Sequence, residues 1–309
     1  MSTLMSGLTP KGPYWATVRQ HRRTLRFAGI AVVLGLASMA WVRFWDSRSV
    51  GLDDPGHGPL RAAMDLAATT LHFLPLLVAV FVAGPLIARE LESGTYKLAL
   101  TQSVTPTRWL ASKLLVAGVV TVVGTLVLVG AFRLGWGGVA GSFRFQWYDQ
   151  GVFDASGPVL VAHVLLALGI GAVLGQLIRR TVVAMAASGV VTGAVLLALN
   201  GLRWEWLPVR TATADFTAGD GIVALIPESA APGDSGLLTA TGERLEGWYC
   251  SEPVNPALCR SDVSVTSHFA DYHPVSQYWP LQLIETGVCL ALAALALFAA
   301  FRILRRRHG

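Results

Sequence analysis

The chain has three lysines, and a lysine can bind the phosphates of a nucleotide. A P-loop needs a lysine directly after a glycine, so that the loop backbone surrounds the phosphates while the lysine reaches the outermost ones. The three lysines here follow Pro10, Tyr96 and Ser112 instead. The sequence has no P-loop, and we expect this chain not to hydrolyse nucleotides.

Histidines that could bind a metal or haem are scattered along the chain. His72 and His163 fall in separate apolar stretches, while His268 and His273 share a polar segment. A histidine in a membrane span can relay protons or bind a cofactor, but a hydrogen bond to a neighbouring helix is its more common state. We expect such bonds for His72 and His163. Metal-ligand spacing is missing, as are the Gly-x-Ser-x-Gly and His-Glu-x-x-His motifs, so we expect no metal, cofactor or catalytic residue.

The cysteines divide between a polar and an apolar environment. Cys250 and Cys259 lie in one polar segment, and Cys289 lies in an apolar one. On the oxidising side of a membrane the first two could form a disulfide or remain thiols, and the sequence leaves both open. We interpret Cys289 as a small apolar residue in a helix interface.

Long apolar helices are the main structural elements that the sequence predicts. The chain is 53% hydrophobic and only 14% charged, with a mean hydropathy of +0.53. A spanning helix needs about 20 apolar residues, and charge at the bilayer centre is costly. Six charge-free runs qualify, the first and last with basic or aromatic side chains reaching the interface from their ends. They lie between Arg26 and Arg43, Asp65 and Arg89, Lys113 and Arg133, Asp154 and Arg179, Arg180 and Arg203, and Glu285 and Arg302. The predicted fold is an all-α integral membrane protein with six transmembrane helices.

The first apolar run has an alternative interpretation as a cleaved signal peptide, because Ala37, Ser38 and Ala40 are small. The long segment before it and the five further spans favour an anchor. Residues 1–26 then form a cytoplasmic N-terminus. Its part from Tyr14 to Arg26 is either an amphipathic interfacial helix or a basic tail that only sets orientation.

Basic residues set the orientation of the spans. With both termini in the cytoplasm, fifteen of the 24 lysines and arginines lie on the inner side. The net charge of +5 does not indicate nucleic acid binding, because the basic residues are interleaved with spans; anionic lipid headgroups are the expected partner. Arginine outnumbers lysine, and both alanine and glycine are abundant. This composition is typical of proteins from a GC-rich bacterial genome. We expect a multi-pass protein of the bacterial plasma membrane.

The spans and their connections define four regions. After residues 1–26, residues 27–203 hold five transmembrane helices, residues 204–280 form a large extracytoplasmic loop or small cap domain, and residues 281–309 form the sixth helix and a basic cytoplasmic tail. Pro75 and Pro85 each remove a backbone hydrogen bond from the second span, which predicts helix kinks.

The fourth and fifth spans are separated by Arg179 and Arg180 alone. They must therefore form an antiparallel hairpin with a very tight turn. Small residues at helical spacing favour close packing within one chain over a dimer face; they are Gly169, Gly171, Gly175, Ala184, Ser188 and Thr192.

The link between the second and third spans, residues 89–113, is charged and contains glycine and proline. Gly94 can end the second span's helix, Thr95 can cap a short helix through Ser103, and Thr105 can cap the next helix with Pro106 at its first position. This predicts a short transverse helix between two long ones. By themselves, its charges could equally solvate an inner loop.

This link resembles the cytoplasmic signature of ABC transporter permeases of the type-two export class. In that family one or two acidic residues after the second span are followed by Gly-Thr, a short coupling helix, a proline with a basic residue, and a lysine at the start of the third span. The corresponding residues here are Glu90, Glu92, Gly94, Thr95, Thr105, Pro106, Arg108 and Lys113. The six-span layout with an amphipathic entry helix matches the rest, although the loop at 204–280 is larger than a compact member would have.

The resemblance implies a role for the link in coupling to an ATPase. Its coupling residues would be Glu90, Glu92, Gly94, Thr95, Lys97, Pro106, Arg108 and Lys113. The chain would be the permease of an ATP-driven exporter, pairing with a second permease chain as a homo- or heterodimer and with ABC ATPase subunits that bind ATP and Mg.

Two other classes of function remain as alternatives. A membrane-embedded enzyme would use His72, His163 or the outer loop, and a non-transporting scaffold or sensor would bind a partner through that loop. The spans offer no intramembrane acidic or basic residue to select a charged cargo, so an apolar or amphipathic substrate is expected of an exporter.

Overall fold

The computed structural model describes residues 22–46, 57–97, 105–140, 145–215, 226–246 and 265–308. The chain divides into two compact units. The first comprises residues 1–140, 150–201 and 282–309, and the second comprises residues 141–149 and 202–281.

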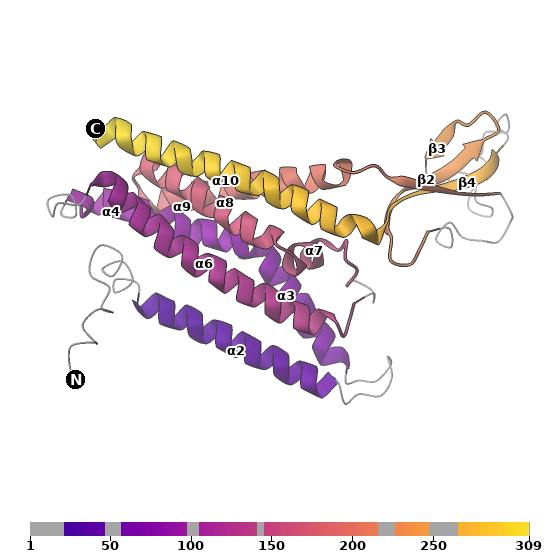
Figure 1. Cartoon of the computed structure of the whole chain (residues 1–309), viewed down its shortest axis with the longest axis horizontal. Coiled ribbons are helices and arrows are strands. Elements are labelled where there is room, and N and C mark those ends of the chain that lie inside the picture. The colour runs from indigo at the N-terminus through magenta and orange to yellow at the C-terminus, as the bar shows by residue number, and fades with distance from the viewer. Residues whose placement is uncertain are drawn as a thin grey trace, which may run out of the picture. The chain divides into compact units, whose positions relative to one another are not determined.

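The first unit is a bundle of helices that run side by side (Figure 1). Its elements are α2 (Arg22–Asp46), α3 (His57–Val78), the π-helical turn η1 (Ala79–Ala83), α4 (Gly84–Ser93), α6 (Pro106–Trp136), α7 (Gln150–Ser156), α8 (Val159–Ile178), α9 (Thr181–Leu202) and α10 (Tyr278–His308).

Five helical stretches among the described residues are long and apolar enough to cross a membrane. They are Gly58–Ser93, Pro106–Trp136, Val159–Ile178, Thr181–Glu205 and Val275–Arg307. The chain is therefore a multi-pass membrane protein. The predicted sixth crossing, α2, is not confirmed: within the described part of this helix, Val32–Trp41 form an apolar stretch that is shorter than the five others.

The second span is one continuous helical stretch built from α3, η1 and α4. Pro75 lies inside α3 and Pro85 lies in the first turn of α4. Between them the backbone widens into a π-turn, in which the Gly84 N–H donates to the carbonyl of Ala79. A π-turn is one of the recognised places where a helix bends. The predicted kinks at the two prolines remain a prediction.

The tight connection between the fourth and fifth spans is confirmed. Helix α8 ends at Ile178 and α9 begins at Thr181. Arg179 has a φ of 54°, a left-handed conformation that lets so short a segment reverse the chain.

Glycines let α8 and α9 pack closely against the second span, one helix parallel to it and the other antiparallel. A Cβ on Gly171 would lie 2.3 Å from the Ala83 Cβ, and Gly175 in the next turn faces Ala88, so α8 runs parallel to this span. On α9, Gly189 faces Val80; the contacts of Gly193 with Leu76 and of Met185 with Gly84 continue this row and show that α9 runs antiparallel to it. The predicted small-residue packing within one chain is confirmed. On α8, Gly171 and Gly175 face the second span, and Gly169 faces Ala293 and Ala296 of α10.

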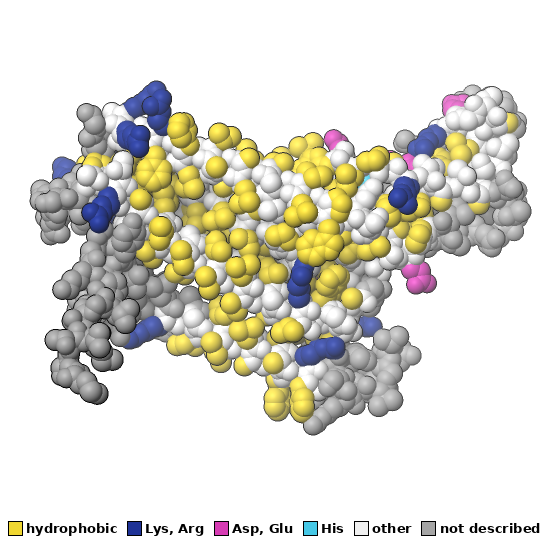
Figure 2. Space-filling view, in the orientation of Figure 1, with side chains coloured by type: hydrophobic (Ala, Val, Ile, Leu, Met, Phe, Trp, Pro, Cys, Tyr) yellow, Lys and Arg dark blue, Asp and Glu magenta, His cyan; other side chains and the backbone are white. Residues whose placement is uncertain are grey.

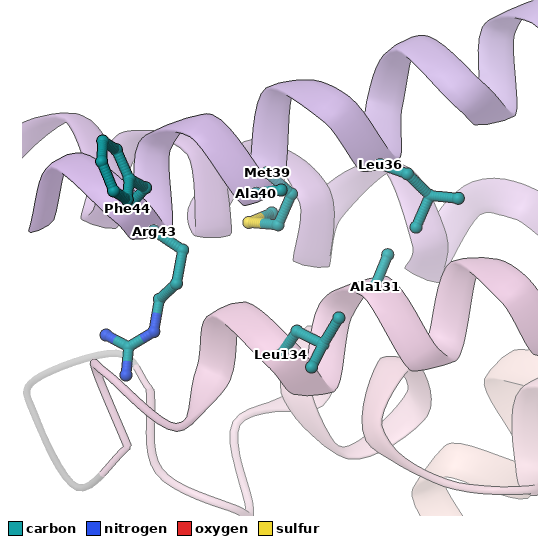
Figure 3. Close-up of a pocket in the computed structure, with 7 residues that line it drawn as sticks. All are labelled: Leu36, Met39, Ala40, Arg43, Phe44, Ala131 and Leu134. Atoms are coloured by element: carbon teal, nitrogen blue, oxygen red, sulfur yellow. The ribbon is translucent and has the colours of Figure 1, made fainter. Parts of the chain in front are cut away.

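Helix α2 packs against α3 and α6 and leaves an open groove of about 560 Å³ beside α6. Figure 3 shows its lining: Leu36, Met39, Ala40, Arg43 and Phe44 from α2, with Ala131 and Leu134 from α6. The Arg43 side chain extends across to the chain just after α6, where a Cβ on Gly138 would lie 2.2 Å from the guanidinium Nη1.

The second unit contains a sheet, which corrects the prediction of an all-α fold. Its strands are β1 (Arg210–Asp215), β2 (Ala231–Thr239), β3 (Arg244–Glu246) and β4 (Val265–His273), in the antiparallel order β1-β4-β2-β3. Strand β1 reads Arg-Thr-Ala-Thr-Ala-Asp and has no large apolar residue, so the alternating pattern that predicts a strand is missing.

A buried carboxylate joins three strands of this sheet. Asp271 on β4 accepts hydrogen bonds from the Thr211 hydroxyl on β1 and, at 2.7 Å, from Arg244 Nη1 on β3. The Arg244 guanidinium also lies 4.7 Å from the centre of the Phe269 ring.

Cys250 and Cys259 lie outside the described residues, as does most of the segment from Tyr14 to Arg26.

Candidate coupling site

The link between α4 and α6 is described for residues 89–97 and 105–113. Figure 2 shows Lys and Arg side chains gathered at the end of the bundle where α6 begins and α10 ends, with hydrophobic side chains covering much of the middle. A polar end beside an apolar belt is the surface expected where helices leave a bilayer.

The local signals at both ends of the link are confirmed. Gly94 ends α4 with a φ of 71°, a left-handed conformation that glycine adopts without steric cost. Thr105 caps α6 by accepting a hydrogen bond from the Arg108 N–H at 3.3 Å, and Pro106 occupies the first turn. The Thr95 hydroxyl instead bonds Ser93 Oγ at 2.9 Å. Helix resumes at Tyr96, and the remainder of the predicted transverse helix lies outside the described residues.

Glu90 points into the protein and holds α4 to α6. Its carboxylate accepts one hydrogen bond from Trp109 Nε1 at 3.0 Å and another from Lys113 Nζ at 2.5 Å. The Lys113 side chain is 5% exposed and that of Glu90 is 16% exposed. Burial of a charge is tolerated when it is paired and hydrogen-bonded, and both conditions hold here.

The aromatic ring of Trp109 also belongs to an apolar cluster that joins four helices. The buried members are Ile87 of α4, Trp109 and Leu110 of α6, Ala172 of α8, and Ala300 and Leu304 of α10. The indole therefore contacts this cluster with its ring while its N–H binds Glu90. A displacement of α4 at this point must either move these neighbours or break their packing.

Glu92 binds the first residue of α9. Its Oε2 accepts from the Thr181 backbone N–H at 2.9 Å and from the Thr181 hydroxyl at 2.5 Å. A carboxylate at a helix N-terminus satisfies an otherwise unpaired N–H and interacts favourably with the helix dipole. The two acidic residues thus connect the end of the second span to the third and fifth spans.

The structure separates the predicted coupling residues into two groups. Lys113 is buried and Glu90 is nearly so, while Thr95, Lys97 and Arg108 are exposed. Sequence reasoning missed Trp109 and Thr181. Trp109 precedes Lys113 by one helical turn and so shares its face, which is a signal that could have been used, whereas no local signal points to Thr181.

The expectation for His72 and His163 is confirmed, but their partners were missed. His72 Nδ1 lies 2.7 Å from Asp154 Oδ2, which joins α3 to α7, and His163 Nε2 lies 3.0 Å from Glu285 Oε1, which joins α8 to α10. Glu285 is fully buried within an apolar span. The expectation that the spans hold no acidic residue was therefore wrong.

Comparison with known families agrees with this geometry. Residues 56–203 match the model of a family described as ABC-2 membrane transporter related. Over this region the chain is similar to that family. The ABC-2 region holds every helix from α3 to α9 together with the link that contains Glu90 and Lys113. The resemblance to ABC-2 type permeases is confirmed. No curated protein and no solved structure matches the chain.

Proposed function

We propose that this ABC-2 permease is the transmembrane subunit of an ATP-driven exporter and works with a separate ATPase subunit. The observation that carries the proposal is the arrangement of the link within the ABC-2 region. Its ion pair, Glu90 and Lys113, holds α4 to α6, while Lys97 and Arg108 on the same link are exposed and could contact a partner.

The contacts of the link support a mechanical role. An ATPase that pushes on the exposed residues would move α4 and α6 together, because Glu90 holds both. The apolar cluster around Trp109 would pass that displacement to α8 and α10. ATP contributes to such a change only through its different affinity for the two conformations. ATP and Mg would bind to the partner ATPase.

The proposed assembly contains two permease chains, identical or different, in the bacterial plasma membrane. Helix α2 provides the sixth crossing, so that both termini are cytoplasmic and the basic end of the bundle faces the ATPase (Figure 2). The orientation rests on the distribution of basic residues between the spans.

The proposed substrate is apolar or amphipathic. Large hydrophobic side chains cover the exposed faces of the spans; examples are Val119 and Val123 of α6 and Val190 and Leu197 of α9. The charged groups within the spans, such as Glu285, are paired and buried in the chain's own bundle. A pathway between two such chains would therefore be lined mainly by apolar groups.

The test is purification of the full chain from its native membrane in mild detergent, followed by identification of co-purifying proteins and measurement of ATP hydrolysis. We expect a stoichiometric P-loop partner with ATPase activity. Lys97→Glu combined with Arg108→Glu should remove it, because both side chains are exposed on the link.

The matched control is Arg305→Glu combined with Arg306→Glu, two exposed basic residues near the end of α10. This variant has the same change in net charge and should keep the partner. A chain that elutes alone and hydrolyses nothing would contradict the proposal and favour a scaffold, a sensor or a membrane-embedded enzyme.

A further inference from the structure

A cluster of buried carboxylates and an imidazole lies in the bundle, away from the coupling site. It comprises Asp154 of α7, His163 of α8 and Glu285 of α10, and one potential ligand atom from each lies within 4.8 Å of the other two. Their side chains are 5%, 5% and 1% exposed, respectively. His72 of α3 approaches the same cluster and bonds Asp154.

We propose that Asp154, His163 and Glu285 bind a divalent transition-metal ion of the zinc class. Two carboxylates and one imidazole form a mixed oxygen and nitrogen ligand set of the kind zinc accepts. In the tetrahedral geometry that zinc prefers, donor atoms at about 2.0 to 2.2 Å from the ion lie about 3.4 Å from one another. The ligand atoms of the cluster lie within 4.8 Å of one another, so binding would draw them together by about 1 Å, a movement within the reach of side-chain rotation.

Charge balance is the second argument for a divalent cation. Two ionised carboxylates in a buried site repel each other and are costly to desolvate. A divalent ion bound between the two carboxylates would offset that repulsion. Magnesium and calcium fit less well, because both prefer a shell made of oxygen and His163 offers nitrogen.

The ligands are held in place by their neighbours, which reduces the cost of assembling the site. Gln282, one turn before Glu285, donates to the Phe153 carbonyl at 2.6 Å and accepts from the Val159 N–H at 3.3 Å. It thereby fixes the turn between α7 and α8 against α10. Gly157 lies in that turn, where a Cβ would be 2.0 Å from Gln282 Oε1.

His72 has the position of an outer partner. Its Nδ1 lies 2.7 Å from Asp154 Oδ2, and its side chain is 29% exposed. Hydrogen-bonded outer partners orient ligating carboxylates, and their loss typically lowers metal affinity about 10- to 100-fold. We therefore assign His72 as a positioning residue for Asp154.

The test is zinc binding by the full chain, purified with an affinity tag that contains no histidine and stripped of metal with a chelator. Calorimetric titration with Zn²⁺ should give one ion per chain, and Mg²⁺ and Ca²⁺ should not compete. His163→Gln and Glu285→Gln should each weaken binding by about 100-fold or more, and His72→Gln by about 10- to 100-fold. The control is His273→Gln, a buried histidine that bonds Gln277 in the second unit, and it should bind zinc like the unaltered chain.

X-ray absorption of the zinc-loaded chain should show nitrogen and oxygen ligands at about 2.0 to 2.2 Å. This measurement and the His72→Gln titration test zinc binding by the cluster even if the variants at His163 and Glu285 do not fold. Absence of stoichiometric binding, or equal affinity in all variants, would overturn the proposal. The cluster would then be a network of hydrogen bonds between the histidine and carboxylate side chains, without a metal ion.

Discussion

Lys113 donates a hydrogen bond to Glu90 at 2.5 Å, and this contact joins the end of the second span to the start of the third. The lysine side chain is 5% exposed, so little water reaches the ammonium group. Glu90 also accepts from Trp109, which belongs to the apolar cluster shared by α4, α6, α8 and α10. A charged link that resembles a solvated loop in the sequence is thus part of the packed structure.

Removing either member of the Glu90 and Lys113 pair should destabilise the chain. Glu90→Gln or Lys113→Met leaves a buried charge without its partner, which typically costs about 3 to 5 kcal/mol. Combining the two changes removes both charges and should restore much of that loss. Thermal unfolding of the single and double variants in one detergent checks this prediction. Additive effects would show that the two groups are not coupled.

Gly171→Ala should destabilise the bundle although alanine is the better helix former. The new Cβ would lie 2.3 Å from the Ala83 Cβ and 2.6 Å from its backbone carbon, and backbone cannot move aside cheaply. Overpacking of this kind costs about 1 to 3 kcal/mol. The control is Gly118→Ala on α6, where no atom lies within 4 Å of the added Cβ. Equal melting temperatures for the two variants would contradict the packing between α8 and η1.

Replacing Pro75 and Pro85 together by alanine should reduce transport by the assembled complex. The two prolines flank the π-turn at Ala79–Ala83, and restoring regular hydrogen bonds there should stiffen the second span. The measurement is ATP-driven substrate movement in vesicles, with ATP hydrolysis and complex yield recorded in parallel. Unchanged transport would mean that this span does not need its irregular turn.

Asp271→Ala should loosen the sheet of the second unit. The buried carboxylate bonds Thr211 and Arg244, so its loss removes the side-chain bonds that supplement the backbone pairing between the strands. A hydrogen bond to a charged group is worth about 1.5 to 3 kcal/mol. Limited proteolysis of the full chain should show faster cleavage within 202–281. Asp234→Ala, an exposed position on β2, should leave the cleavage rate unchanged.

Features that depend on residues close together in the chain could be predicted from the sequence. Long runs without charge located the five apolar helices, because a bilayer excludes charge. Gly94 and Thr105 marked the ends of α4 and the start of α6, since a left-handed residue and an N-terminal cap are local requirements of any helix. The two arginines between α8 and α9 fixed a tight reversal because nothing else separates the two helices.

Contacts between side chains far apart in the sequence became known from the folded arrangement alone. In the sequence Glu90 resembles a charge for docking a partner, but in the structure it pairs with Lys113 of α6. His163 and Glu285 are far apart in the sequence, and the packing of α8 against α10 brings them into contact. The sheet was missed because β1 lacks an alternating apolar pattern and obtains its hydrogen bonds from β4. Pairing between distant residues depends on how helices and strands are arranged in three dimensions, and a pattern read along the chain does not contain that arrangement.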